Sequence, residues 1–233
     1  MIETSYRKTL QYAFYMNSVI RLPLPLDPEQ TARLLALQAA FAGVCNVLAP
    51  VVAQQRCWNR VTLHHLMYHQ LREQFPALGS QMICNAIYMV CKMSRLVYQG
   101  SGSPFHVALA GASVLPTIRF DDQCPVHFDS HTLSMKSGQL SIFTMGGRMR
   151  FALPLKPAHM LRFASKRVLE ITLHRRPDGV HELSFFFEPP AAAPAEVAAP
   201  VPALVTPVTR ARPRPAVAVA PRWPDYLHVE ATP

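Results

Sequence analysis

Long apolar runs are missing from this sequence of 233 residues. No stretch approaches the roughly 18 uninterrupted apolar residues typical of a transmembrane helix, which argues against a membrane-spanning protein. The first ten residues, MIETSYRKTL, also lack the short basic segment and following apolar run of a secretory signal. We therefore expect a soluble, cytoplasmic protein with no membrane partner.

Motifs that carry catalysis or cofactor binding are also absent. The chain contains no G-x-S-x-G, no phosphate-cradling glycine loop and no dinucleotide fingerprint. Adjacent carboxylates are scarce: Asp121 and Asp122 form one such pair, without the second cluster that a two-metal site requires. The sequence therefore predicts no catalytic residue and no cofactor.

Cysteine and histidine give little support for a metal site. The five cysteines are odd in number and include no C-x-x-C pair, so we expect buried reduced thiols rather than disulfides. His64, His65 and His69 cluster in the second predicted helix, and the spacing from His65 to His69 puts two imidazoles on one face. No further ligand follows at a recognisable spacing, so a structural or solvent-facing role is favoured over a metal.

The composition indicates a globular body with a basic surface. Half of the residues are hydrophobic and 16% are charged, and 23 basic against 14 acidic residues give a net charge of +9. That balance favours a polyanionic partner. Half of the 22 prolines lie in residues 189–233, and this segment has too little apolar surface to offset its ordering entropy. We predict a disordered Pro/Ala-rich tail there.

The first half of the body predicts one strand and three helices. Residues 10–22 are aromatic and β-branched, as in a strand. A helix follows from Asp27 as N-cap to the vicinity of Arg56. A second helix is predicted from a Thr62 cap to Phe75, and a third from a Ser80 cap to about Val97.

After the GSGSP stretch at 100–104, the hydrophobic period changes to two residues, as in strands. Turns are predicted at Ser137-Gly138, Gly146-Gly147 and Pro177-Asp178-Gly179, since glycine accepts the backbone angles of tight hairpins. The fold class is therefore α+β, with antiparallel strands after the helices. The predicted strands are 113–120, 131–136, 139–145, 148–155, 168–175 and 180–188.

Basic and amide side chains are the candidate binding residues for nucleic acid. Arg148 and Arg150 flank Met149 on one predicted strand and so share a face, with Arg119 and Lys136 on neighbouring strands. The alternative is the ordinary solvated face of an antiparallel sheet. Gln81 and Asn85 lie four apart on one helix face, where amides suit adenine edges. The remaining candidates on the helices are Asn59, Arg60, Tyr68 and Arg72.

Four stretches of the sequence contain the predicted strands and helices in chain order. They are IRLPLPLDPEQTARLLALQAAFAGVCNVLAPV, NRVTLHHLMYHQLREQFPALGSQMICNAIYMVCKMSRLVY, LSMKSGQLSIFTMGGRMRFALPL and LHRRPDGVHELSFFFEPP. In the first, Pro28, Glu29 and Gln30 open a helix that leads through an aromatic residue to Cys45 and Asn46. In this order, over about residues 10–190, they resemble the N-terminal part of the TnpB (OrfB) proteins of insertion sequences, which are transposon-encoded relatives of type V CRISPR effectors.

The resemblance implies a fold and partners. The fold is a barrel-like, OB or wedge-type β domain with an inserted three-helix recognition unit. The partners are a guide RNA and the double-stranded DNA next to a target, since in such systems base pairing reads the sequence and the protein reads shape. The implied division is 1–26 for the first wedge strand, 27–100 for the recognition insert, 101–188 for the wedge strands and 189–233 for the tail.

The resemblance also implies residue roles and one departure. Tyr68, Gln81 and Asn85 would face the target-adjacent duplex or the heteroduplex, and Arg119, Arg148 and Arg150 would face the RNA scaffold. In the family, the strand LSFFFE leads into a RuvC nuclease and later a zinc ribbon. Here the chain runs into EPPAAAPAEVAAP instead, so no nuclease carboxylates are present and no enzyme activity is expected.

Three hypotheses follow. The leading one is a nuclease-deficient, TnpB-like protein that binds RNA and DNA, working alone or with a separate nuclease subunit as half of a split effector. The second is a decayed transposon remnant with no selected activity, because the low-complexity tail stands where the nuclease would start. The third is a protein-interaction module with the Pro-rich tail as the ligand.

Overall fold

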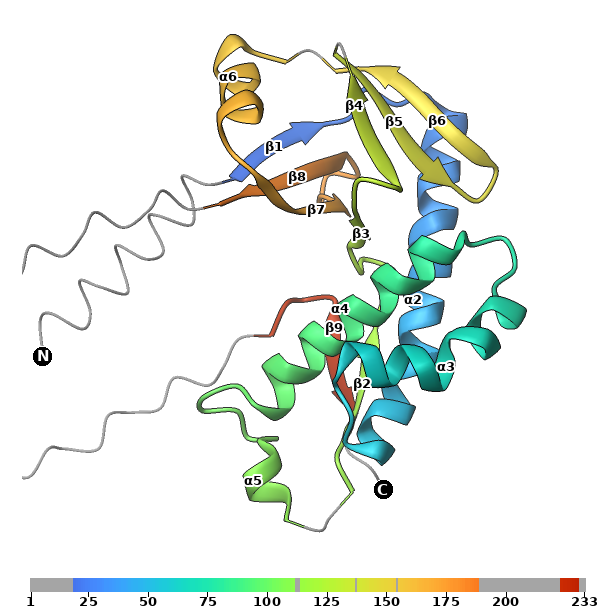
Figure 1. Cartoon of the computed structure of the whole chain (residues 1–233), viewed down its shortest axis with the longest axis vertical. Coiled ribbons are helices and arrows are strands. Elements are labelled where there is room, and N and C mark those ends of the chain that lie inside the picture. The colour runs from blue at the N-terminus through green and yellow to red at the C-terminus, as the bar shows by residue number, and fades with distance from the viewer. Residues whose placement is uncertain (1–18, 112–113, 137, 154, 189–222, 231–233) are drawn as a thin grey trace, which may run out of the picture.

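The computed structural model describes residues 19–111, 114–136, 138–153, 155–188 and 223–230. Three helices and three small antiparallel sheets make up most of it (Figure 1). This arrangement confirms the predicted α+β class with antiparallel strands. Residues 10–18 of the first predicted strand lie outside the described residues, and its described part is β1 (Val19–Pro23).

The three predicted helices are present, with small differences at their starts. α2 (Pro28–Gln55) begins with a full capping box between Asp27 and Gln30. α3 (Arg60–Gln74) is capped by Asn59 rather than Thr62, because the Asn59 side chain accepts hydrogen bonds from the backbone N–H groups of Val61 and Thr62. α4 (Ser80–Tyr98) starts one residue earlier than predicted, with Gly79 at its N-cap.

The strands form three separate sheets. The largest has the order β1-β8-β7-β3, the second is the meander β4-β5-β6, and the third pairs β2 with β9. These sheets do not close into a barrel within the described part of the chain, so the barrel-like expectation is wrong in that respect. The reason is that β1 and β3 stay as edges of the largest sheet instead of pairing with the meander. The strands are β2 (Thr117–Phe120), β3 (Val126–Phe128), β4 (Leu133–Lys136), β5 (Gln139–Thr144), β6 (Gly147–Ala152), β7 (Val168–Arg175), β8 (His181–Phe187) and β9 (Leu227–Glu230).

Helix α2 is the central helix of the hydrophobic core. It is long and apolar enough to cross a membrane by length and composition alone, yet half of its most apolar window is buried inside the protein. Its buried side chains pack against α4 and β2. Burial against other elements is the behaviour of the core helix of a soluble protein.

Two polar side chains of α2 fix its position against the sheets. Asn46 donates to the backbone carbonyl of Phe120 and accepts from the Phe120 N–H, both at 2.8 Å, so it behaves as a neighbouring strand at one edge of β2. The buried Gln38 pairs its Oε1 with His181 Nε2 at 3.1 Å. Buried amides of this kind are stable only because each is hydrogen-bonded.

Several elements were not predicted. α5 (Val107–Ala110), α6 (Pro157–Ser165) and β3 have no counterpart among the expected segments. Residues 223–230 were assigned to a disordered tail, yet they contain β9, which pairs with β2. The tail prediction is therefore wrong for these residues, and 189–222 and 231–233 lie outside the described residues.

The prediction of buried reduced thiols is confirmed for three of the five cysteines, since Cys57 and Cys84 are only partly buried. All five thiols are free, and Cys45, Cys91 and Cys124 are buried in the core. Burial raises the pKa of the Cys91 thiol to about 11, because the thiolate would lose its hydration. The Cys91 thiol is therefore protonated at neutral pH.

Candidate functional site

The outer face of the meander β4-β5-β6 brings together three of the predicted cations. Lys136, Arg148 and Arg150 are exposed there, together with the side chains of Ser134 and Ser141. The register explains the grouping, because Ser134 lies opposite Ser141, which lies opposite Arg150. Side chains two residues apart on a strand share a face. We call this surface the cationic groove. It has a volume of about 450 Å³ and is lined by Ser134, Lys136, Gln139, Leu140, Ser141, Arg148 and Arg150.

The Arg148 side chain is held against the strands by hydrogen bonds to neutral groups. Its Nε donates to Ser141 Oγ at 2.9 Å, and its terminal nitrogens donate to the carbonyls of His131 and Ser141, both at 3.1 Å. None of these partners carries a charge, so the positive charge of the guanidinium stays uncompensated. A guanidinium held in place loses less conformational entropy when it binds an oxyanion.

Helix α2 and the N-cap residue of α4 contact the meander near the β5–β6 turn. Arg33 of α2 donates to Thr144 Oγ1 at 2.7 Å and to the carbonyls of Gly146 and Gly147, which form the β5–β6 turn. Gly147 has φ +97, as the predicted turn chemistry requires. Gly79 lies so close to Phe143 that an added Cβ would be 3.1 Å from the ring. The helices therefore fix the position of the groove relative to the core.

The predicted Arg119 lies elsewhere. It is on β2, in the separate two-stranded sheet, where its side chain pairs with Glu230 at 3.2 Å. Its charge is thus matched by a carboxylate of β9, and it does not contribute to the cationic groove. The resemblance had placed it with Arg148 and Arg150 on one RNA-facing surface, and the structure separates them.

Three predicted residues of α3 lie on another part of the surface. Asn59 is used as the α3 cap, so its side-chain oxygen is already occupied. The guanidinium carbon of Arg60 lies 5.8 Å from the ring centre of Tyr88, a cation–π distance. Tyr68 stacks on His64 with ring centres 4.5 Å apart. These contacts stabilise the helical unit.

The side chains of the other three candidates form hydrogen bonds within the protein. Arg72 donates to the carbonyl of Leu78, and Gln81 donates to the Asp129 carboxylate. Asn85 is only 6% exposed and donates to the carbonyl of His127 at 3.1 Å. A side chain buried in this way has no free edge for a base, so the predicted base contact of Asn85 is wrong in this conformation.

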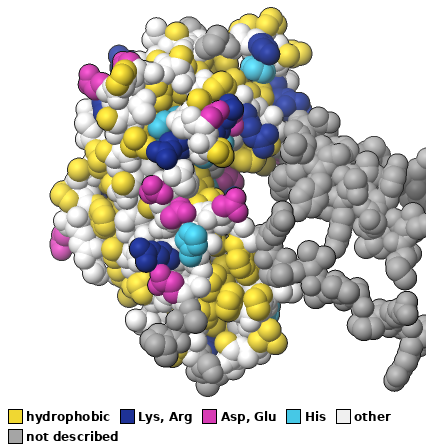
Figure 2. Space-filling model, turned by 180° about the vertical axis from the view of Figure 1, so that it is seen from behind, with side chains coloured by type: hydrophobic (Ala, Val, Ile, Leu, Met, Phe, Trp, Pro, Cys, Tyr) yellow, Lys and Arg dark blue, Asp and Glu magenta, His cyan; other side chains and the backbone are white. Residues whose placement is uncertain are grey.

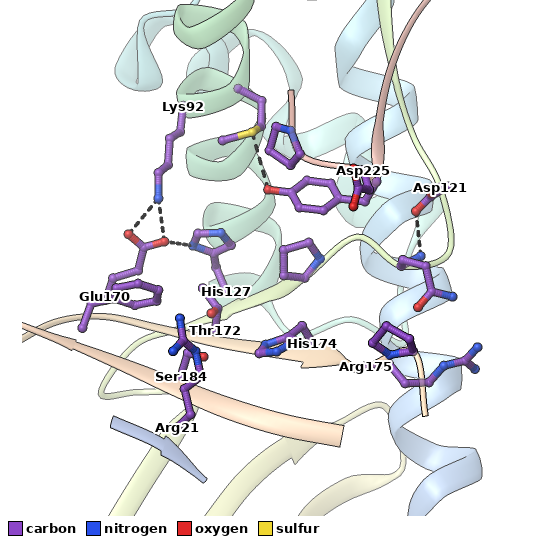
Figure 3. Close-up of a pocket in the computed structure, with 17 residues that line it drawn as sticks. Arg21, Lys92, Asp121, His127, Glu170, Thr172, His174, Arg175, Ser184 and Asp225 are labelled. Carbon is purple, nitrogen blue, oxygen red and sulfur yellow. Dashed lines mark hydrogen bonds and ion pairs between the residues drawn. The ribbon is translucent and has the colours of Figure 1, made fainter. Parts of the chain in front are cut away.

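A second polar region, which the sequence did not indicate, lies between the four-stranded sheet and α4. It is a cavity of about 720 Å³, and charged side chains of both signs surround it (Figure 2). Its floor is a row across all four strands, Arg21, Ser184, Thr172 and His127, set by the strand register. We call it the polar cavity; Figure 3 shows these side chains beneath α4 and the segment that precedes β9.

Glu170 of β7 connects two elements at one end of the polar cavity (Figure 3). It accepts from Lys92 of α4 at 2.7 and 2.8 Å, and it lies 3.1 Å from Nδ1 of His127 on β3. Burial lowers the pKa of His127 to about 4, although Glu170 opposes this shift. At pH 7 the imidazole is therefore neutral, and its contact with Glu170 is a hydrogen bond rather than an ion pair.

Most other charges of the polar cavity are also matched. Glu182 lies 3.9 Å from Arg21 and 3.3 Å from His174, and Asp121 lies 3.2 Å from His228. By contrast, the hydroxyls of Thr172 and Ser184 make no hydrogen bond to any described residue, although both residues are buried. The cavity can therefore hold a polar ligand through hydroxyls without a net excess of charge.

The sequence contains a pattern that could have indicated the polar cavity, but the pattern is ambiguous. Strands β7 and β8 alternate apolar residues with Glu170, Thr172, His174, Glu182 and Ser184, which is equally the pattern of a solvated sheet face. Only the packing of α4 and of residues 224–226 over that face turns it into a cavity.

Among the described residues, no cluster of three or more His, Cys, Asp or Glu side chains could hold a metal ion. No protein-family model and no curated protein matches this chain.

Proposed function

We propose that this chain binds RNA through the cationic groove and that it acts as a nuclease-deficient, TnpB-like RNA-binding protein. The observation that carries the proposal is the groove itself. It gathers Lys136, Arg148 and Arg150 on one sheet face, and none of its lining residues within the described chain is a carboxylate. The net charge of +9 supports attraction of a polyanion over a longer range.

The groove chemistry favours the sugar–phosphate backbone over bases. Arg and Lys contact phosphates, and the hydroxyls of Ser134 and Ser141 with the amide of Gln139 can hydrogen-bond a ribose 2′-hydroxyl. Phe143 of the same strand packs at Gly79 rather than offering a free ring for stacking. The expected recognition is therefore of RNA shape, with sequence supplied by base pairing of the RNA.

The remaining parts of the proposal rest on the resemblance. The RNA would be a guide RNA, a double-stranded DNA next to the target would be the second partner, and any cleavage would come from a separate nuclease subunit. The wedge assignment of the sheets belongs to the same proposal. The helical surface of α3, with Arg60 and Tyr68, is the part of the recognition unit that remains available to such a duplex.

Titration of a labelled structured RNA at several salt concentrations tests this function. Binding through three cations predicts that the logarithm of the affinity falls with the logarithm of salt concentration with a slope of about −2. The triple variant Lys136→Gln, Arg148→Gln, Arg150→Gln should lose about 100-fold in affinity and most of that slope. An equivalent DNA should bind more weakly, since it lacks the 2′-hydroxyl.

The matched control is Arg167→Gln, which removes an exposed cation outside the groove. It should change the affinity less than about threefold, since one distant charge is screened at physiological salt. Arg167→Gln removes one charge and the triple variant removes three, so a loss in Arg167→Gln equal to that of the single groove variant Arg150→Gln would show that only overall charge matters. A wild-type chain with no salt-dependent RNA affinity would contradict the proposal and favour the transposon remnant.

A further inference from the structure

The segment Trp223–Glu230 is bound to the body as an extended ligand. It forms β9, which pairs antiparallel with β2, in the register Thr117 to Glu230 through Phe120 to Leu227. In addition, the N–H of Asp121 donates to the carbonyl of Tyr226 at 3.1 Å. Figure 1 shows β9 beside β2, next to α4. The mode of attachment is β-strand addition to a sheet edge.

Three apolar side chains anchor the segment. Leu227 is 4% exposed, and Tyr226 donates its hydroxyl to Met93 Sδ on α4 at 3.7 Å. The ring of Trp223 lies 6.5 Å from that of Phe105. Burial of apolar side chains is the dominant favourable contribution to association, so anchors of this kind hold a short strand without a covalent link nearby.

Two polar side-chain pairs match this segment to its acceptor. Glu230 lies 3.2 Å from Arg119, and His228 lies 3.2 Å from Asp121, so complementary groups face each other in the antiparallel register. An unrelated apolar strand would lack these partners. Complementary charges select a partner more than they add affinity.

The acceptor edge is built independently of the segment. On its other side β2 is fixed by both hydrogen bonds from Asn46, and Ile118 and Phe120 are each 1% exposed, packed with α2 in the core. The edge therefore stays formed when the segment leaves. An open strand edge is a template for another strand.

We propose that the edge of β2 is a strand-acceptor site for the segment Trp223–Glu230 of a second copy of this chain, giving a dimer by reciprocal exchange. Residues 189–222 separate the segment from the end of β8. A chain of about 34 residues spans at most ~110 Å, enough to reach an adjacent copy. The same contacts form in either arrangement, so exchange needs no new interface.

Residues 189–222 connect the segment to β8, and we call them the tether. The tether determines whether the segment docks on its own chain or on a second copy. A tethered ligand experiences an effective concentration on the order of millimolar, so docking within one chain predominates at micromolar protein. Exchange becomes measurable as the protein approaches the millimolar range.

Incubation of the full chain at about 10 µM and at about 1 mM, followed by sizing with light scattering, tests the exchange. We expect the dimer fraction to rise at least tenfold between these concentrations. Leu227→Asp should stay monomeric because its segment cannot dock, whereas Leu109→Asp, an equal change at an exposed site, should dimerise like the wild type. Concentration-independent mass, or a dimer that persists in Leu227→Asp, overturns the proposal.

A labelled peptide of residues 223–230 tests the acceptor site itself. The full-length Leu227→Asp chain, with its own segment unable to compete, should bind the peptide at least tenfold more tightly than the wild type. A peptide carrying Leu227→Asp should not bind. Absence of peptide binding by a chain with native circular dichroism overturns the acceptor site. Neither experiment contains nucleic acid, so its outcome is independent of RNA binding.

Discussion

The cationic groove and the polar cavity contain similar residue types but differ in how their charges are satisfied. In the groove, Arg148 is held by neutral groups, and its charge remains open to solvent. In the cavity, Glu170 pairs with Lys92, and Arg21 of the cavity floor lies 3.9 Å from Glu182. The comparison teaches that the number of unmatched charges, rather than the number of charges, marks a surface for a polyanion. Groove residues should therefore affect binding, and cavity residues should affect stability.

The largest expected effect on stability concerns His127. Its pKa is about 4 in the folded protein and near 6.5 when unfolded, so the unfolded chain binds the proton first as the pH falls. The stabilisation is complete above pH 6.5 and is lost towards pH 4, a decrease of about 3 kcal/mol in the free energy of unfolding. His127→Gln should remove this part of the pH dependence in denaturant titrations.

Other histidines provide the control for that measurement. Burial also lowers the pKa of His174 and His181, so some acid sensitivity remains in His127→Gln. His174→Gln should therefore remove a separate part of the acid sensitivity. If the free energy of unfolding of His127→Gln still falls by the full wild-type amount below pH 6.5, the stabilising role assigned to the polar cavity is contradicted.

A smaller effect is expected for Glu170. Glu170→Gln removes the carboxylate that pairs with Lys92 and hydrogen-bonds the neutral His127, and it should lower the free energy of unfolding by about 1–2 kcal/mol, since Lys92 is partly solvated. Glu230→Gln removes one partner of the exposed pair with Arg119 and should cost about 0.5 kcal/mol. Chemical denaturation measures both. Equal losses would mean that the cavity network is no stronger than a surface pair.

The smallest effect on stability is expected in the groove. The Arg150 side chain is exposed and makes no hydrogen bond or ion pair to another described residue, so Arg150→Gln should change the free energy of unfolding by at most ~0.5 kcal/mol. The same variant should reduce the salt slope of RNA binding by about 0.7. A destabilised Arg150→Gln with an unchanged slope would reverse the roles assigned to the two regions.

Elements specified by neighbouring residues were predicted well. The capping box of Asp27 and Gln30 and the turn at Gly146-Gly147 involve groups within a few residues of one another, and both are present. The shared face of Arg148 and Arg150 follows from strand alternation and is also present. Each of these features depends on backbone geometry that does not change with the rest of the fold.

Features that depend on distant partners were not predicted. Asn85 has the spacing of an exposed amide, but β3 covers it and takes its hydrogen bond. β9 lies in a proline-rich segment whose composition favours disorder, yet pairing with β2 and burial of Leu227 order it. Helix α6 was missed because it is short, with nine residues in Pro157–Ser165, and lies between two predicted strands.

The sequence alone determined the three long helices, most of the strands, the hairpin turns and the alternation that groups the groove cations, because these depend on interactions within a few residues. The tertiary structure decided which charges remain unmatched. Glu170 meets Lys92 and Arg119 meets Glu230 across large sequence separations, and only folding brings such groups within 4 Å. Coulomb attraction between partly solvated groups is strong only at such short range, so chain order cannot reveal which cations stay free.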